Sequence, residues 1–357
     1  MISTRRTFLH ASSALAVSGL CAAGDAAAQS CGFSKGQTIS FVVPYGAGGG
    51  YDTYARLLAS HMEPLAGTEI VVSNLASTTA GAKVIRDAKP DGRTIGILNV
   101  TETMLRRMLE GDEHPDLFAD FVLLGQIAET PTVWVTAPGS GIDTIDDLMK
   151  LAATRPIVAG TRSVSNPDFA GMAVVASLAD FRLESVTGYR VSNEVILSMI
   201  RGEVDLVSFS YETLRPFIES GEVRPILQLT SAPLAEAPKL AEVPFAGGPE
   251  GWLARRAAER GADVAKVGEL GDGLVAMSVQ PRTIVTCRGV EAGMAACLKQ
   301  LFVTAVNSPA LRAEAAALQR SIIPIPGDEL AAKLHRLQPV LAGFAPAIRE
   351  AQSRARG

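Results

Sequence analysis

The chain has 357 residues, and its 33 Lys and Arg residues against 37 Asp and Glu residues give a formal net charge of −4 at pH 7. A mildly acidic chain without a block of basic residues offers no electrostatic surface for nucleic acid, so we expect no nucleic-acid partner. We also expect no metal site, because the four cysteines form no Cys-x-x-Cys pair and no His, Cys and carboxylate residues stand at metal-ligand spacing.

The N-terminus has the pattern of an export signal. Arg5 and Arg6 precede an apolar stretch at about 11–23, and three alanines at 26–28 offer small residues for cleavage. The run 4–9 resembles the twin-arginine export motif. We therefore predict that residues 1–28 are a cleaved twin-arginine-type signal. A membrane anchor is the alternative, but the apolar run is shorter than the roughly 20 residues that a span needs.

The first part of the mature chain alternates strands with helices. Residues 39–43, 69–74 and 94–100 are apolar runs typical of buried strands, and residues 52–62 and 81–88 are the expected helices between them. Continuous apolar strands separated by helices indicate a parallel sheet that is covered on both faces.

A second unit begins near Phe121. The apolar runs 121–128 and 132–137 flank residues 129–131, a candidate crossover between domains. Residues 156–179 then repeat the opening pattern of strand, small polar loop and long helix. Residues 233–271 are hard to place from their composition. After them, 283–287 predicts a strand that returns to the first domain, and 329–351 predicts a helix interrupted at Pro339.

About 330 residues follow the signal, which is more than a single hydrophobic core usually supports, so two domains are expected. We predict an α/β fold of two lobes, each a mostly parallel sheet flanked by helices. Residues 37–127 with 283–357 form the first lobe, and residues 128–282 form the second. Cys287 and Cys297 are close enough in sequence to form a disulfide, which leaves Cys31 over; two separate buried thiols are the alternative.

The loop between the first strand and the first helix is a candidate anion site. Glycines let the backbone approach a ligand, and the start of the following helix favours negative charge. The candidate contacts in this loop are Tyr45, Gly46, Ala47, Gly48 and Gly49. Asp52 follows them, and we expect it to stabilise the helix or to contact the ligand through its backbone, because its carboxylate repels an anion.

A dinucleotide-binding enzyme is the main alternative for a glycine loop of this kind. Tyr51 stands where the G-x-G-x-x-G pattern needs its third glycine, and no acidic residue follows the strand near Asn74. We therefore predict no cofactor, no catalytic residue and no enzyme activity. An exported cofactor-dependent enzyme stays open as an alternative, as does a sensory receptor that signals through a membrane partner.

Several segments resemble one known family. PYGAGGGYDTYARLL, at 44–58, resembles the signature P-[FY]-x-A-G-G-x-x-D-x-x-A-R of the Bug-type receptors of tripartite tricarboxylate transporters. VVSNLASTTAGA at 71–82, AKPDGRTIGIL at 88–98, RGEVDL at 201–206 and ESGEVRPILQLTS at 219–231 are similar to further family segments. The resemblance covers most of the mature chain and is thin from about 245 to 280.

The resemblance implies a periplasmic Venus-flytrap protein that closes on a small carboxylate and delivers it to a membrane permease. It also implies that backbone amides, hydroxyls and water from both lobes hold the carboxylate, without a charged side chain. We expect a monomer with these two partners, a small carboxylate and the permease subunits.

The second loop departs from the family pattern G-S-x-G-x-G-S-P-S-H. Serines replace two glycines, Phe169 replaces the histidine, and Arg162 replaces a small residue. A guanidinium that faced the cleft would hold a carboxylate through two hydrogen bonds, and a solvent-facing or ion-paired arginine is the alternative. The candidate ligand contacts in this loop are Thr161, Arg162, Ser163, Ser165 and Asn166, although the hydroxyls and Asn166 also suit a helix cap.

Three further candidates follow strands of the two lobes, where cleft residues lie in such folds. These candidates are Thr101, Tyr189 and Tyr211. Glu102 and Glu212 stand beside two of them, and each would accept a hydrogen bond from a ligand or orient neighbouring backbone.

Overall fold

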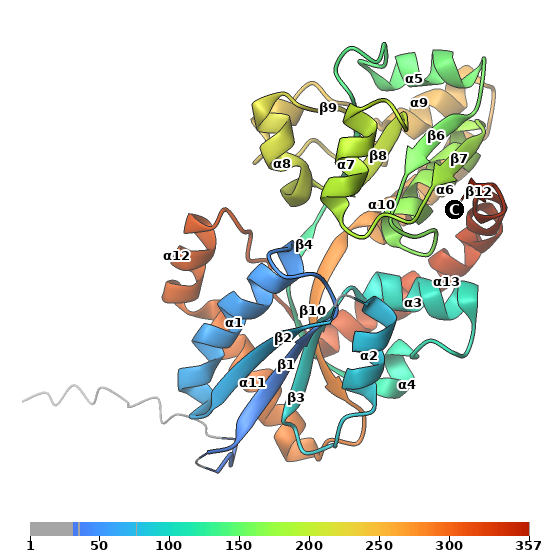
Figure 1. The fold of residues 1–357 in the computed structure, drawn as a ribbon. Coiled ribbons are helices and arrows are strands. Elements are labelled where there is room, and N and C mark those ends of the chain that lie inside the picture. Colours follow the sequence, from blue (N-terminus) through green and yellow to red (C-terminus); the bar gives the residue numbers. More distant parts are fainter. Residues whose placement is uncertain (1–30, 35, 76, 357) are drawn as a thin grey trace, which may run out of the picture.

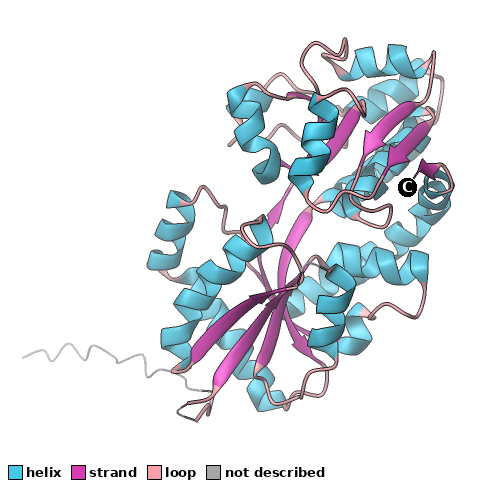
Figure 2. Ribbon diagram, viewed as in Figure 1, coloured by secondary structure: helices cyan, strands magenta, loops and turns pink. Residues whose placement is uncertain are grey.

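The computed structural model describes residues 31–34, 36–75 and 77–356, so the predicted export signal at 1–28 lies outside the described residues. Two six-stranded sheets, each flanked by helices, form two lobes (Figure 1, Figure 2). This architecture confirms the prediction of a two-lobed α/β fold.

The first sheet has the strand order β11-β4-β10-β3-β1-β2. Its strands are β1 (Thr38–Val43), β2 (Glu69–Asn74), β3 (Thr94–Leu98), β4 (Phe121–Thr130), β10 (Gln280–Cys287) and β11 (Ile325–Pro326). Strand β1 pairs in parallel with β2 and β3, whereas β10 pairs antiparallel with β3 and β4. Strand β10 runs against its neighbours because it brings the chain back from the second lobe, in agreement with the returning strand predicted at 283–287.

Local sequence explains the helices around this sheet. They are α1 (Gly50–Ala66), α2 (Thr78–Arg86), α3 (Val100–Glu110), α4 (Leu117–Asp120), α11 (Ala292–Asn307) and α12 (Pro309–Ala317). Helix α1 buries Tyr54, Leu58 and Met62, which recur at helical spacing, and it ends at Gly67 with a φ of 66°. Helix α3 begins at Asn99, whose side chain accepts a hydrogen bond from the backbone N–H of Glu102.

The second sheet has the order β12-β7-β6-β8-β5-β9. Its strands are β5 (Thr132–Thr136), β6 (Ile157–Gly160), β7 (Leu183–Val186), β8 (Leu206–Ser210), β9 (Arg224–Leu229) and β12 (Ala355–Arg356). Strands β12, β7, β6 and β8 are parallel, and β5 runs antiparallel to β8 and β9. In both sheets, therefore, most strands share one direction.

Helices of the second lobe include the segment that composition could not place. They are α5 (Ile145–Ala152), α6 (Pro167–Ala179), α7 (Ser192–Ile200), α8 (Tyr211–Ser220), the 3₁₀ helix η1 (Pro238–Leu240), α9 (Trp252–Glu259) and α10 (Val264–Ser278). Residues 233–271 thus supply η1, α9 and part of α10. Helix α6 is buried along almost its whole length, since α9, α10, α13 and α3 pack around it.

Within the described residues, the chain crosses between the two sheets at three places. Strand β4 leads into β5 through Pro131, α10 leads back into β10, and α13 (Gly327–Gln352) ends at β12. Helix α13 packs on β4 of the first sheet and on α6 of the second lobe (Figure 1). The division of the chain at 127/128 and 282/283 stays a prediction, and the pairing of β12 with β7 places the last strand on the second sheet rather than with the rest of 283–357.

The predicted interruption of the last helix at Pro339 is wrong. Helix α13 continues from Gly327 through Pro339 and Pro346 to Gln352. Leu337, Leu341 and Phe344 lie on both sides of Pro339 and are all buried. Their packing stabilises the helix across a residue that cannot donate a backbone hydrogen bond.

The disulfide considered between Cys287 and Cys297 does not form, and the alternative of two buried thiols holds only for Cys287. Cys297, on α11, forms a disulfide with Cys31, and their Cα atoms are 5.6 Å apart. Cys287, the last residue of β10, is a free buried thiol whose Sγ atom contacts the backbone carbonyl of Lys89. Proximity along the chain was a poor guide, since the disulfide joins residues that are 266 positions apart.

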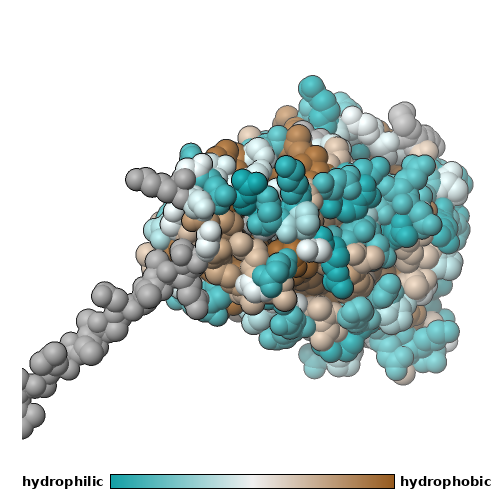
Figure 3. All heavy atoms as spheres, turned by 90° about the horizontal axis from the view of Figure 1, so that it is seen from below, coloured by the Kyte–Doolittle hydropathy of each residue, from teal (hydrophilic) through white to brown (hydrophobic). Residues whose placement is uncertain are grey.

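The surface mixes polar and apolar residues. Figure 3 shows the molecule from below the first lobe, with hydrophilic residues around smaller hydrophobic areas. Exposed large hydrophobic residues include Val71, Val191 and Ile323. In the part of the chain that the structure describes, no helix is both long and apolar enough to pass through a membrane.

Candidate ligand-binding site

A cavity of about 610 Å³ lies between the two lobes. Residues 45–51, which connect β1 to α1, line it from the first lobe. From the second lobe it is lined by Arg162, Asp168, residues 190–193 and residues of 209–217, and Gln280 and Arg282 of β10 complete the wall. The cavity therefore lies where strand ends and helix starts of both lobes meet, as the sequence predicts.

The residues between β1 and α1, here called the glycine loop (44–49), present backbone to the cavity. Gly48 has a φ of 75°, which a side chain would strain, and Gly46 to Gly49 are exposed. No side chain caps the start of α1 at Gly49. Helix α1 therefore begins beside the cavity with open backbone N–H groups, an arrangement that favours an anion.

Asp52 shapes the glycine loop and does not line the cavity. Its carboxylate accepts hydrogen bonds from the backbone N–H of Gly48 at 2.8 Å and from Nδ2 of Asn74 at 3.0 Å, and it pairs with Arg56 at 3.0 Å. Burial opposes ionisation, but these three contacts together lower the pKa of Asp52 below its usual value. The structural role expected for Asp52 agrees with these contacts.

Two tyrosines, one in the glycine loop and one in the first turn of α1, form an aromatic wall. The rings of Tyr45 and Tyr51 are stacked with centroids 3.8 Å apart. The Tyr45 hydroxyl accepts a hydrogen bond from the backbone N–H of Asn99, and the Tyr51 hydroxyl donates to the carbonyl of Pro281. Burial raises the pKa of Tyr45 well above its usual value and raises the pKa of Tyr51 to about 12. Both hydroxyls therefore stay neutral at ordinary pH.

The residues between β6 and α6, here called the serine loop (161–166), contribute one side chain to the cavity. Arg162 lines the cavity, and no hydrogen bond or ion pair of its guanidinium to any described residue is present. Its Nε atom is buried without a partner. A buried donor on a cation is costly to leave unpaired, so this guanidinium is available to an anion in the cavity.

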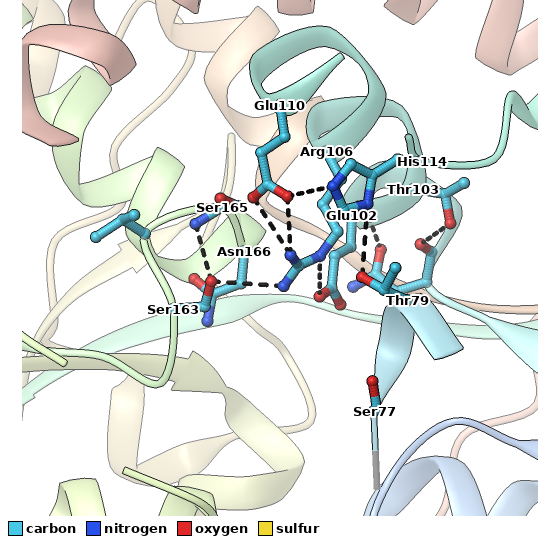
Figure 4. A network of polar contacts seen from close by, with 12 residues as sticks. Ser77, Thr79, Glu102, Thr103, Arg106, Glu110, His114, Ser163, Ser165 and Asn166 are labelled. Carbon is cyan, nitrogen blue, oxygen red and sulfur yellow. Dashed lines mark hydrogen bonds and ion pairs between the residues drawn. The ribbon is translucent and has the colours of Figure 1, made fainter. Parts of the chain in front are cut away.

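The other predicted residues of the serine loop hold the loop together. The Thr161 hydroxyl donates to the carbonyl of Ser163, and the Asn166 side chain accepts from the backbone N–H of Phe169 as the cap of α6. Ser163 accepts from the N–H of Ser165 and from Arg106 of α3, so it also joins the two lobes (Figure 4). Ligand contact by these four residues stays a prediction.

Asp168, in the first turn of α6, is a site residue that sequence reasoning missed. It lines the cavity and is only 4% exposed. Its Oδ1 atom accepts a hydrogen bond of 2.6 Å from Nε2 of Gln280. Burial raises the pKa of Asp168 to about 7; Glu102 adds to this effect, and Arg162 and Arg282 oppose it.

A second missed group lies where β10 enters the first lobe. Arg282 is 2% exposed, and its guanidinium carbon lies 4.1 Å from the centre of the Tyr51 ring. Gly50 permits this approach, because a Cβ atom there would come within 3.3 Å of Nη2 of Arg282. A charged residue inside the buried strand 280–287 was the signal that could have identified it, since arginine is rarely buried without a partner.

Glu212 connects the second lobe to this cationic group. Its carboxylate accepts a 2.7 Å hydrogen bond from the Tyr54 hydroxyl, lies 3.3 Å from Arg320 and lies 4.0 Å from Arg282. Its Oε2 atom still lacks a hydrogen bond to any described residue. Glu212 therefore offsets part of the positive charge beside the cavity.

The remaining predicted residues lie away from the main cavity wall. Thr101 is buried in the first turn of α3, and Glu102 beside it pairs with Arg106 at 3.1 Å. Tyr189 packs against the core of the second lobe, and Tyr211 lines a separate cavity of about 420 Å³ at the crossover. Six of the predicted residues thus share the main cavity: Tyr45, Gly46, Ala47, Gly48, Gly49 and Arg162.

The charges on the cavity wall favour an anionic ligand. Four arginines line it, Arg162, Arg190, Arg282 and Arg320, against the two carboxyl groups of Asp168 and Glu212. In a cavity with low-dielectric walls such an excess of positive charge attracts an anion. Among the described residues, no group of three or more His, Cys, Asp and Glu residues is arranged to hold a metal ion.

Comparison with known proteins places this geometry in context. The family model described as "Tripartite tricarboxylate transporter family receptor" matches residues 54–291. The UPF0065 protein in the tcbD-tcbE intergenic region of Pseudomonas sp. (strain P51) is 30% identical over 210 residues, which cover 58% of this chain and 61% of that protein. The chain thus aligns with about three fifths of the length of this relative.

Solved structures share the fold at low sequence identity. An R. palustris protein with adipate superposes with a TM-score of 0.69 at 18% identity, covering 90% of this chain and 99% of that one. MatC of Rhodopseudomonas palustris with bound malate gives a TM-score of 0.67 at 17% identity, with coverage of 88% and 100%. These similarities establish the common two-lobed fold.

Proposed function

The chain belongs to the tripartite tricarboxylate transporter receptor family, and from this membership we propose that it is an extracytoplasmic solute-binding protein that captures a small carboxylate between its two lobes. The observation that carries the proposal is the unpaired guanidinium of Arg162 on the wall of a cavity with excess positive charge. No catalytic step is needed for this role, and capture and release are its whole activity.

A carboxylate in the cavity would contact both lobes. The start of α1 and the glycine loop offer backbone N–H groups from the first lobe, and Arg162 offers its guanidinium group from the second. A ligand that contacts both lobes binds the closed arrangement more tightly than the open one, so it shifts the population toward closure. A membrane permease would recognise that closed form and receive the ligand.

The partners and the location follow from the same role. We propose that the mature chain is a periplasmic monomer, exported by the predicted twin-arginine-type signal and cleaved after residue 28. The permease subunits of a tripartite carrier are its proposed protein partners. Solved proteins of the same fold hold malate and adipate, which makes these two acids suitable first probes.

A panel of acids tests the proposal. The purified mature chain is screened by thermal shift with malate, succinate, adipate and benzoate, and binding of each hit is measured by calorimetry at pH 6.5. We expect at least one acid to raise the melting temperature and to bind with one site per chain. If none of the acids binds, while neutral or cationic solutes do, the proposal of carboxylate capture is wrong.

A further inference from the structure

Asp168 is a buried carboxyl group on the wall of a cavity that we propose to hold a carboxylate. An ionised side chain at this position would repel the ligand, and burial weakens the screening of that repulsion. Arg162 of the serine loop would then divide its positive charge between an ionised Asp168 and the ligand. The presence of Asp168 in the cavity therefore needs a physical explanation.

The hydrogen bonds around Asp168 fix which of its oxygen atoms is free. The cap of α3 requires Oδ1 of Asn99 to accept from the N–H of Glu102, so the Asn99 amide group points the other way and donates to Oε1 of Gln280 at 3.0 Å. The Gln280 amide group then donates from Nε2 to Oδ1 of Asp168. Each of these hydrogen bonds fixes the orientation of one side-chain amide, because an amide accepts through its oxygen and donates through its nitrogen.

A proton on Asp168 consequently resides on Oδ2. Oδ1 already accepts the hydrogen bond from Gln280, whereas Oδ2 has no hydrogen-bond partner among the described residues. Since Asp168 lines the cavity, a proton on Oδ2 would be a donor available to a ligand there. A carboxylic acid that donates to a carboxylate forms a short, charge-assisted hydrogen bond.

The charged groups facing Asp168 come from four elements. Arg162 of the serine loop and Arg282 of β10 favour its ionised form, and Glu102 of α3 opposes it. The Tyr51 hydroxyl of α1 also acts on it but stays neutral at ordinary pH. With burial as the largest effect, the pKa of Asp168 lies at about 7, so a modest change decides its protonation.

We propose that the protein captures its carboxylate ligand together with one proton, which is held on Oδ2 of Asp168 and donated to an oxygen atom of the ligand. The inference rests on the proposed function, since it requires an anionic ligand. One ligand carboxylate, one Asp168 carboxylate and one proton from solvent give one hydrogen-bonded pair. The guanidinium of Arg162 offsets the single negative charge that remains.

The inference has a quantitative consequence. Affinity is nearly constant while Asp168 of the free protein is already protonated, and it falls about tenfold for each pH unit once the proton must be taken from solvent. Asp168→Asn should remove this dependence. Its amide oxygen can accept from Gln280, and its NH2 group can donate where Oδ2–H did, so the variant imitates the protonated side chain.

The experiment measures the dissociation constant of every panel acid that binds, by calorimetry from pH 6.5 to 9. The last ionisation of these acids lies below about pH 6, so the probes are almost wholly ionised from pH 7 upward. Wild type, Asp168→Asn and the control Asp146→Asn are compared. Asp146 is a matched control, because it is also an acid in the first turn of a second-lobe helix but is exposed and does not line the cavity.

We expect wild type and Asp146→Asn to lose at least thirtyfold in affinity between pH 7 and pH 9, and Asp168→Asn to lose less than threefold. Calorimetry of the wild type at pH 8.5, in buffers that differ in ionisation enthalpy, should report about one proton taken up per ligand bound. This second measurement needs no variant, so it shows whether a proton is taken up with the ligand even if Asp168→Asn fails to fold.

Two results would overturn the inference while leaving the proposed function intact. One is an affinity for the acids that does not change with pH in the wild type, together with no proton uptake. The other is loss of binding by Asp168→Asn at every pH, which would show that an ionised Asp168 accepts a hydrogen bond from the ligand. If no acid binds at any pH, the proposed function itself fails, and the inference fails with it.

Discussion

The glycine loop and the serine loop face each other across one cavity but use opposite means to meet a ligand. The glycine loop carries no charged side chain, and the one acid that follows it, Asp52, is occupied by Gly48, Asn74 and Arg56. The serine loop and the turn after it present Arg162 and Asp168, both with polar atoms that have no partner in the described chain. The charged side chain beside the glycine loop is therefore paired without a ligand, whereas the charged side chains beside the serine loop are not.

The two loops therefore contribute to ligand binding in different ways. Backbone N–H groups and a helix start can receive an anion of almost any shape, because they carry no side-chain preference. A guanidinium and a carboxyl group that are buried beside the cavity have a free energy cost in the empty protein, and a complementary ligand lowers it. Selectivity for one acid over another should therefore come from the second lobe.

The largest expected effect concerns the stability of the ligand-free protein and the charge on Asp168. The pKa of this group is about 7 in the folded chain and near 3.8 in an unfolded one, so the folded chain binds more protons between these values. The free energy of unfolding must then decrease as pH rises from about 4 to above 7, with an upper limit of roughly 4 kcal/mol for three pKa units.

Urea denaturation at pH 5 and pH 8.5 measures this effect. Asp168→Asn should be more stable than wild type at pH 8.5 and close to it at pH 5, and Asp146→Asn should follow the wild type at both. Parallel curves for Asp168→Asn and wild type would mean that Asp168 is ionised in the folded protein throughout, and the two loops would then differ less than their contacts suggest.

The next effect concerns affinity and Arg162. Arg162→Ala should weaken binding of a panel acid about a hundredfold, near 3 kcal/mol, because it removes a charge-assisted contact and leaves no other free guanidinium in the serine loop. Arg190→Ala is the matched comparison. Arg190 also lines the cavity, but its side chain is 88% exposed and pairs with Glu194 at 3.3 Å. Calorimetry should show a loss of affinity of less than tenfold for this variant. Equal losses of affinity for the two variants would mean that Arg162 contributes no more to binding than Arg190.

A smaller effect is expected on the side of the glycine loop. Asp52→Ala deprives the Gly48 N–H, the Asn74 amide and Arg56 of their common acceptor, and we expect the free energy of unfolding to fall by about 2 kcal/mol. Asp52→Asn keeps an acceptor for Gly48 and should lose about half as much. The effect on affinity should be smaller than that of Arg162→Ala, because Asp52 does not line the cavity. A larger loss of affinity than of stability would indicate direct contact with the ligand.

The sequence allowed the fold to be predicted more fully than the site. Apolar runs and their spacing locate the strands of both sheets, because burial leaves its pattern in neighbouring residues. The disulfide of Cys31 with Cys297 and the continuous helix through Pro339 leave no such local pattern, since each depends on packing between distant segments. They could not be derived from spacing.

The same limit applies to the cavity. The glycine loop and Arg162 were candidates from the sequence, because they lie in or beside a motif that repeats in both lobes, although a solvent-facing Arg162 was the alternative. Asp168 resembled an ordinary acid in the first turn of a helix, and Arg282 lay at the end of the region without a recognisable motif. Only the folded chain shows that Gln280 joins Asp168 to Asn99 of the opposite lobe.

The smallest expected effect tests the contact between the lobes themselves. Arg106 of α3 donates to Glu102 and Glu110 of its own helix and, at 3.4 Å, to the Ser163 hydroxyl of the serine loop (Figure 4). Ser163→Ala removes this bond between the lobes, together with the bond from the N–H of Ser165 within the serine loop, and leaves the two bonds of Arg106 within its own helix. A single hydrogen bond is worth about 0.5 to 1.5 kcal/mol, and a long one lies at the lower end.

We therefore expect Ser163→Ala to weaken binding of a panel acid two- to threefold, because the arrangement with both loops at the cavity becomes less populated. Thermal melting of the ligand-free protein should change by less than 2 °C, since the two removed bonds lie at a loop and add little to either core. Ser60→Ala is the control, because among the described residues the Ser60 hydroxyl bonds only to the carbonyl of Leu57 in its own helix. A loss as large as that of Arg162→Ala would mean that Ser163 itself contacts the ligand, and the serine loop would then contribute both a charge and a hydroxyl to recognition.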